Sequence, residues 1–205
     1  NISYSNGTLT ISPATLTITG TKTYSGGATF GTSNLTVTGL FNADTVGTAL
    51  ANSPNVAANG SNYFTSFTMS TGNASNYQLV SSGYNATTNR ATITPATLTV
   101  TGSKVYDATT AFSSSALTVT DFLNGETASG FSAISSNLNV SANNYFTGIS
   151  WTNGTAVMSN YQVSNGYSST SNAATITPAS ITVTGTKSYD ASTVFNAANL
   201  AVTGL

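Results

Sequence analysis

A lysine, a tyrosine and an aspartate recur close together in this sequence, inside a phrase that is written three times. The copies read ISPATLTITGTKTYSGGATF at 11–30, ITPATLTVTGSKVYDATTAF at 93–112 and ITPASITVTGTKSYDASTVF at 176–195. In the middle copy Lys104, Tyr106 and Asp107 stand within four residues. An amine, a phenol and a carboxylate at this spacing have the groups needed to move protons or to hold a polar ligand.

Seven of the nine charged residues occupy equivalent positions in different copies of the repeat. These candidate site residues are Lys22, Lys104, Lys187, Asp107, Asp190, Asp44 and Glu126. They form either a lysine–carboxylate site in each repeat or a structural set of ion pairs and turn-capping aspartates, since Asp bonds its own backbone two residues on. The structural interpretation is favoured, because the first copy has Ser25 in place of the aspartate.

An internal covalent crosslink is a further interpretation of the same residue types. Some surface domains join Lys to Asn, or Thr to Gln, with a nearby carboxylate that shuttles the proton. Lys104 with Glu126, and the two glutamines Gln78 and Gln162, have side chains suited to such a reaction. Loss of ammonia from the intact mass would reveal the bond.

The composition excludes most other chemistry. The chain has 205 residues with no Cys and no His, so thiol nucleophiles, imidazole bases and the usual zinc ligands are absent from it. Only five acidic residues are present, too few for calcium joints between repeats. We therefore assign no catalytic residue, no metal site and no cofactor, and do not expect an enzyme. The net charge of −1 predicts no nucleic-acid partner, and the absence of any apolar run of 18 residues predicts no insertion into a membrane.

The repeats divide the chain into modules. The period is 82 residues from Ile11 to Ile93 and 83 from Ile93 to Ile176. A unit of this size is long enough to fold as a small domain. The expected boundaries are 1–10 for the end of a preceding segment, 11–93 and 94–176 for two whole modules, and 177–205 for the start of a third. Because the chain starts without Met and stops inside a phrase, we expect it to be part of a longer protein.

Alternating polar and apolar residues predict β-strands throughout the chain. The alternation changes parity at Pro95: Ala91 and Ile93 are apolar at odd positions, and Leu98 and Val100 at even ones. Since proline donates no ladder hydrogen bond, one strand is expected to end near Ile93 and the next to begin just after Pro95. The sequence predicts an all-β protein of tandem small antiparallel sandwich-like domains in an extended rod, with β-grasp-like modules as the alternative.

Nine of the ten tyrosines also lie in register between copies. They are Tyr24, Tyr106 and Tyr189; Tyr63 and Tyr145; Tyr77 and Tyr161; Tyr84 and Tyr167. Such a series either stacks on sugars or packs half-buried in the core with its hydroxyls bound to protein. Core packing is the favoured interpretation.

Several motifs in fixed order resemble one known family. The run ITPATLTVTGSKVYDATT is followed by NGET or NADT, then by SNYQ, and closes on the next ITPA. This pattern resembles the YDG-type mostly-β repeats of very large bacterial exoproteins of the filamentous haemagglutinin kind. The family's name-giving Gly is replaced by Ala108 and Ala191, whereas the first copy has Gly26. A position that accepts Ala is expected to need no positive φ.

The resemblance implies a mechanical function outside the cell. In that family, arrays of such repeats act as stalk or fibre modules in adhesion and biofilm matrix at the bacterial surface. We therefore expect an extracellular chain that holds a binding tip away from a cell or builds matrix. Its expected partners are neighbouring repeats, possible laterally associated chains, and a ligand at a tip elsewhere in the protein. A self-assembling filament or sheath subunit and a glycan-binding module are the alternatives.

Overall fold

The computed structural model describes residues 7–57 and 60–204, so residues 1–6 of the expected segment 1–10 lie outside it. Within these ranges the chain forms nineteen strands, and its helices are five 3-10 turns of three residues each. The all-β class expected from the sequence is confirmed. No helix in the described ranges is long and apolar enough to cross a membrane.

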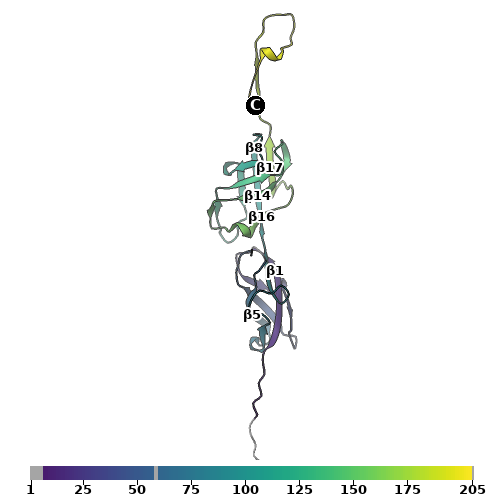
Figure 1. Cartoon of the computed structure of the whole chain (residues 1–205), viewed down its shortest axis with the longest axis vertical. Coiled ribbons are helices and arrows are strands. Elements are labelled where there is room, and N and C mark those ends of the chain that lie inside the picture. Colours follow the sequence, from purple (N-terminus) through teal and green to yellow (C-terminus); the bar gives the residue numbers. More distant parts are fainter. Residues whose placement is uncertain (1–6, 58–59, 205) are drawn as a thin grey trace, which may run out of the picture. The chain divides into compact units, whose positions relative to one another are not determined.

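The chain divides into two compact units, coloured along the sequence in Figure 1. The first contains residues 1–96, 122–126 and 155–162, and the second contains 97–121, 127–154 and 163–205. Two short segments of the second sequence repeat therefore belong to the first unit.

The first repeat folds into two sheets. Its elements are β1 (Ala14–Thr23), β2 (Thr29–Gly31), η1 (Thr32–Asn34), β3 (Leu35–Thr38), β4 (Thr45–Ala51), β5 (Phe64–Thr71), η2 (Ala74–Asn76), β6 (Tyr77–Leu79) and β7 (Asn89–Thr94). The long strand β1 pairs with β3 on one side, and with β6 and then β7 on the other. The strands β2, β4 and β5 form a separate antiparallel sheet.

The second repeat has the same plan with more interrupted strands. Its elements are β8 (Ala96–Val105), β9 (Ala111–Ser113), η3 (Ser114–Ala116), β10 (Leu117–Thr120), β11 (Ala128–Ser129), β12 (Ser132–Ser135), β13 (Ser141–Asn144), β14 (Phe146–Ser150), β15 (Asn153–Gly154), η4 (Met158–Asn160), β16 (Tyr161–Val163) and β17 (Asn172–Thr177). The order β10–β8–β17–β13 forms the main sheet, and β9–β12–β14 forms the smaller one. Strands β8 and β17 lie side by side although they are far apart in the sequence (Figure 1).

The pairing differs from the purely antiparallel arrangement expected. Strand β1 is parallel to both β6 and β7, and β8 is parallel to β17. Alternation along a strand is the same in both kinds of ladder, so the sequence pattern could not separate them. The first and last strands of each repeat are parallel neighbours, which is closer to the β-grasp alternative than to an antiparallel sandwich.

Pro95 interrupts the chain where the parity change predicts. Strand β7 ends at Thr94 and β8 begins at Ala96, so a single residue separates two strands. Ala91, Ile93, Leu98 and Val100 are all buried, as their alternation requires.

The core of each repeat is built around a pair of phenylalanines. Phe30 and Phe64 meet edge to face with their ring centroids 5.0 Å apart, and Phe112 and Phe146 do the same at 5.0 Å. All four rings are fully buried. Gly102 in the repeated phrase allows this packing, because a Cβ there would lie 3.1 Å from the Phe146 ring and 2.6 Å from the Ala116 carbonyl oxygen.

The tyrosines do not all join the core. Tyr24, Tyr77 and Tyr161 are buried, as the favoured interpretation expected, but Tyr106 and Tyr189, in the register of Tyr24, are exposed. Tyr84 and Tyr167, which form a register of their own, are exposed as well. Position in the repeat therefore does not decide burial alone, and the neighbours of each copy must also contribute.

The third copy of the phrase contributes the first strand of a hairpin in the second unit. Strands β18 (Thr182–Gly185) and β19 (Leu200–Thr203) pair antiparallel, with η5 (Ala197–Asn199) leading into β19. Their apolar residues remain largely uncovered, with Val183 52% and Val202 43% exposed.

Candidate functional site

The repeated lysine closes the loop that follows the first strand of each repeat. Lys104 Nζ donates to the carbonyl oxygens of Thr109 and Ala111, both at 2.8 Å, and to Asp107 Oδ1 at 2.6 Å. The ammonium also lies 5.0 Å from the centroid of the Phe112 ring. The side chain thus satisfies backbone acceptors at the turn and covers the core phenylalanine.

The same arrangement occurs in the other two copies. Lys22 Nζ donates to the carbonyl oxygens of Gly27 and Thr29 at 2.5 and 2.9 Å. Lys187 Nζ donates to those of Ser192 and Val194 at 2.7 and 2.9 Å. In every copy the acceptors stand five and seven residues after the lysine, so the spacing fixes the shape of the loop.

The aspartate supports this loop without being required for it. Asp107 Oδ1 accepts from the Thr109 N–H at 3.0 Å as well as from Lys104, and Asp190 repeats both contacts. The hydrogen bond from Lys104, followed by that from the Thr109 N–H, lowers the pKa of Asp107 to about 2. In the first copy the Ser25 hydroxyl stands in this place, 3.2 Å from Lys22 Nζ.

The residue after this position has a left-handed backbone in every copy. Ala108 has φ of 61° and Ala191 has φ of 58°, while Gly26 in the first copy has φ of 76°. The expectation of an ordinary turn at the alanines is therefore wrong. The contacts of the lysine and the capping aspartate hold the turn, and they impose the strain on a side chain that rarely adopts this conformation.

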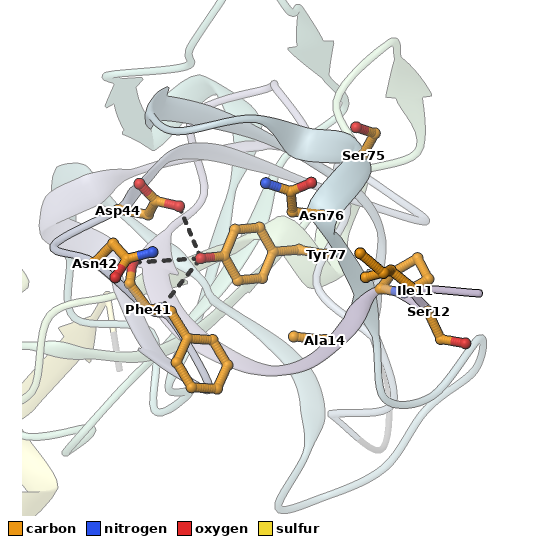
Figure 2. Close-up of a pocket in the computed structure, with 10 residues that line it drawn as sticks. Ile11, Ser12, Ala14, Phe41, Asn42, Asp44, Ser75, Asn76 and Tyr77 are labelled. Atoms are coloured by element: carbon orange, nitrogen blue, oxygen red, sulfur yellow. Dashed lines mark hydrogen bonds between the residues drawn. The ribbon is translucent and has the colours of Figure 1, made fainter. Parts of the chain in front are cut away.

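The two other recurring carboxylates bind tyrosines. Tyr77 Oη donates to Asp44 Oδ2 at 2.8 Å and accepts from the Phe41 N–H at 3.1 Å, as Figure 2 shows. In the second repeat Tyr161 Oη donates to Glu126 Oε2 at 2.7 Å and accepts from the Leu123 N–H at 3.0 Å. The tyrosine therefore ties the start of one strand to the loop that carries the carboxylate.

Glu126 takes part in a larger cluster within the first compact unit. Its second carboxylate oxygen accepts a hydrogen bond from Tyr24 Oη, and the rings of Tyr24 and Tyr161 meet edge to face with centroids 5.5 Å apart. The fully buried Asn160 accepts from the Val56 N–H at 2.8 Å. We call Tyr24, Val56, Glu126, Asn160 and Tyr161 the tyrosine–carboxylate joint.

The environment of the tyrosine–carboxylate joint raises the pKa of both of its tyrosines. Burial, then the hydrogen bond to Glu126 and its charge, raise the pKa of Tyr24 to about 12. Burial also raises the pKa of Tyr161, and Glu126 adds to the effect. For Tyr77 the hydrogen bond from the Phe41 backbone lowers the pKa, but burial and Asp44 outweigh it and raise the value overall.

The residues considered for a crosslink have other partners. Lys104 binds the turn around Asp107, whereas Glu126 binds Tyr24 and Tyr161. The glutamines Gln78 and Gln162 lie on β6 and β16 with exposed side chains.

Two buried asparagines were not found by the sequence analysis. Asn172, at the start of β17, accepts from the Phe146 N–H at 2.8 Å and donates to the carbonyl oxygens of Phe146, Ser164 and Gly166 at 3.0, 2.6 and 3.2 Å. Asn89 makes the corresponding four bonds at the start of β7. Each stands four residues before the isoleucine of the repeated phrase, a register that would have indicated them.

These groups bind other parts of the protein itself. The lysines bind carbonyl oxygens, the carboxylates bind phenols and amides, and the buried asparagines join β5 or β14 to a loop. Within the described residues, no group of three or more metal-binding side chains lies together.

Comparison with known proteins assigns part of the chain to a family. Residues 88–172 match the YDG domain, from just before β7 to the first residue of β17. No curated protein matches the chain significantly. No solved structure does so either.

Proposed function

We propose that the chain is a series of mechanical spacer repeats from a large secreted bacterial surface protein. In this role the repeats extend a binding tip from the cell, or build matrix, and carry out no catalysis. The observation that carries the proposal is the use of the recurring polar residues: Lys104 and its equivalents bind the turn that follows them, and Glu126 binds tyrosines. The recurring polar residues therefore stabilise the fold of each repeat through internal contacts.

The YDG domain match and the low content of charged residues are consistent with this role. Only 4% of the residues are charged, so hydroxyls and amides must keep the chain in solution. The filamentous haemagglutinin-like setting and the extracellular location follow from the resemblance of the repeated motifs to that kind of exoprotein.

Solution scattering combined with glycan arrays tests the proposal. We expect the purified chain to scatter as an elongated particle and to give no saturable binding on an array of host and bacterial glycans. Saturable binding of one glycan by a single repeat would favour the glycan-binding alternative instead. Turnover of a substrate would overturn the proposal altogether.

A self-assembling filament or sheath subunit is the second candidate function. Only 4% of the residues are charged, and charge-poor strand edges are prone to pair with other chains. A filament or sheath subunit would form ordered fibres visible by electron microscopy from the purified chain. If the purified chain forms no fibres at high concentration, the self-assembly function is rejected and the spacer function remains.

A further inference from the structure

Two phenols share one carboxylate in the tyrosine–carboxylate joint. One oxygen of Glu126 accepts from Tyr161 Oη at 2.7 Å, and the other oxygen accepts from Tyr24 Oη. The two rings meet edge to face, with centroids 5.5 Å apart and planes at 75° to each other. Because both hydroxyl groups reach the same carboxylate, the hydroxyl ends of the rings converge. The joint thus holds two oxidisable rings in contact, with a proton acceptor beside both.

Tyr77 provides a comparison with a single phenol. Its hydroxyl donates to Asp44 as that of Tyr161 donates to Glu126, and Figure 2 shows this bond. Within residues 7–57 and 60–204, the Asp44 carboxylate accepts from no second tyrosine. A tyrosine on a carboxylate is therefore a feature of both repeats, whereas the pair of phenols on one carboxylate is a feature of the joint.

The shared carboxylate favours one-electron oxidation of both rings. A phenol that loses an electron becomes a strong acid, so a base that already holds its hydroxyl proton makes the loss easier. Because burial raises the pKa of Tyr24 to about 12, this phenol keeps its proton until an electron leaves. Electrons cross several ångströms of protein without direct contact, so burial does not prevent the oxidation. Burial does separate the resulting radicals from other chains, since Tyr24 is 4% and Tyr161 is 7% exposed.

We propose that Tyr24 and Tyr161 form a modification site, at which hydrogen peroxide acting through a peroxidase couples the two side chains into dityrosine. Each phenol gives one electron to the oxidant and its hydroxyl proton to Glu126, which passes the proton to water. The two radicals then form a carbon–carbon bond between the ring carbons next to the hydroxyl-bearing carbons. Those two carbons lose their hydrogens as protons while both oxygens regain protons, which restores the phenols. One peroxide takes up the two electrons and two protons and becomes two water molecules.

The new bond joins two sequence repeats inside the first compact unit. Tyr24 follows the lysine of the first copy of the repeated phrase, and Tyr161 begins β16 of the second repeat. A covalent bond between such distant residues closes a long loop, which restricts the unfolded chain and so stabilises the folded one. This modification goes beyond the spacer function and does not depend on it, because the chemistry needs only the geometry of the joint.

Oxidation of the full 205-residue chain, followed by mass spectrometry, tests the site directly. The dilute chain is treated with hydrogen peroxide and a peroxidase until exposed tyrosines begin to join separate chains, and the monomer is then isolated. Trypsin cuts after the four basic residues, which places Tyr24 on fragment 23–90 and Tyr161 on fragment 105–187. We expect a monomer that has lost two hydrogen atoms, with these fragments joined and the bond mapped to Tyr24 and Tyr161. A monomer without this bond, when other tyrosines have reacted, would overturn the proposal.

Three kinds of variant separate the site from general tyrosine oxidation. Tyr24→Phe should abolish the joined fragments, whereas Tyr84→Phe and Tyr167→Phe, at exposed tyrosines on the same two fragments, should leave their yield unchanged. Glu126→Gln keeps both rings but removes the base, so dityrosine fluorescence of the monomer should rise at least about tenfold more slowly. Circular dichroism confirms that each variant is folded. An equal rate in Glu126→Gln would contradict the proposed site, whereas the scattering and glycan results judge the spacer function separately.

Discussion

The first and second repeats solve the same structural problems with partly different residues. In both repeats a lysine donates to two carbonyl oxygens, and a buried asparagine binds the backbone of a core phenylalanine. A tyrosine hydroxyl donates to a carboxylate in both as well. They differ in the turn after the lysine, where one has Ser25-Gly26 and the other Asp107-Ala108. The contacts to backbone atoms are thus the shared part, and the side chains that support them vary.

The largest effect is expected where the repeats agree. Asn172→Ala should lower the free energy of unfolding of the second unit by about 3–5 kcal/mol, because four backbone groups, two of them fully buried, lose their partner. Fluorescence of Trp151, the single tryptophan and part of that unit, reports the loss during denaturant unfolding. Asn165→Ala at an exposed neighbour is the control and should cost little. A change below 1 kcal/mol for Asn172→Ala would show that the network is not structural.

The next largest difference between the repeats is expected in the stability that the tyrosine after the recurring lysine contributes. Tyr24→Phe should cost about 1–2 kcal/mol through the lost hydrogen bond to Glu126, whereas Tyr106→Phe should cost under about 0.5 kcal/mol. Because the pKa of Tyr24 is raised to about 12 in the folded chain, its contribution is present below pH 10 and is lost as pH rises from 10 to 12. Urea unfolding followed by circular dichroism at pH 7 and pH 11 measures this loss, and Tyr24→Phe should reduce it.

Acid should distinguish the two lysine loops. The pKa of Asp107 is lowered to about 2, so its contribution is present above the unfolded value near 4 and is lost as pH falls from about 4 to about 2. Asp107→Ser, which copies Ser25, should remove this part of the acid sensitivity seen by Trp151 fluorescence. An unchanged acid profile in that variant would mean that the ion pair contributes nothing in solution.

The smallest effect concerns the left-handed residue, where glycine should be favoured over alanine in both repeats. Ala108→Gly should stabilise the second unit by about 0.5–1 kcal/mol, because glycine adopts positive φ without strain. Gly26→Ala should instead destabilise the first unit, since the new Cβ would lie 1.9 Å from Asn124 Nδ2, which donates to the Ser25 carbonyl oxygen. Thermal unfolding of the two variants measures both effects, and the same sign in both would contradict the explanation.

The alternation of polar and apolar residues predicted many of the strands, but it could not predict which distant strands pair. Alternation and Pro95 indicated the strands on either side of residue 95, and the register of Lys104 and Glu126 indicated residues with structural contacts. The parallel pairing of β1 with β7 could not be predicted, because it depends on which distant segments meet. The presence of alanine at 108 does not reveal the turn's positive φ, because the neighbouring contacts impose that conformation on a residue that rarely adopts it.

The parallel pairing of first and last strands has a mechanical consequence. Tension on the chain pulls β1 by its amino end and β7 by its carboxyl end, and in parallel neighbours these ends lie at opposite ends of the ladder. The load therefore acts as shear along the strands, and the six residue pairs from Ile18 with Asn89 to Thr23 with Thr94 resist it together. Strands β8 and β17 form the same parallel ladder with six residue pairs of their own. Both repeats are therefore expected to resist stretching until all six pairs separate together.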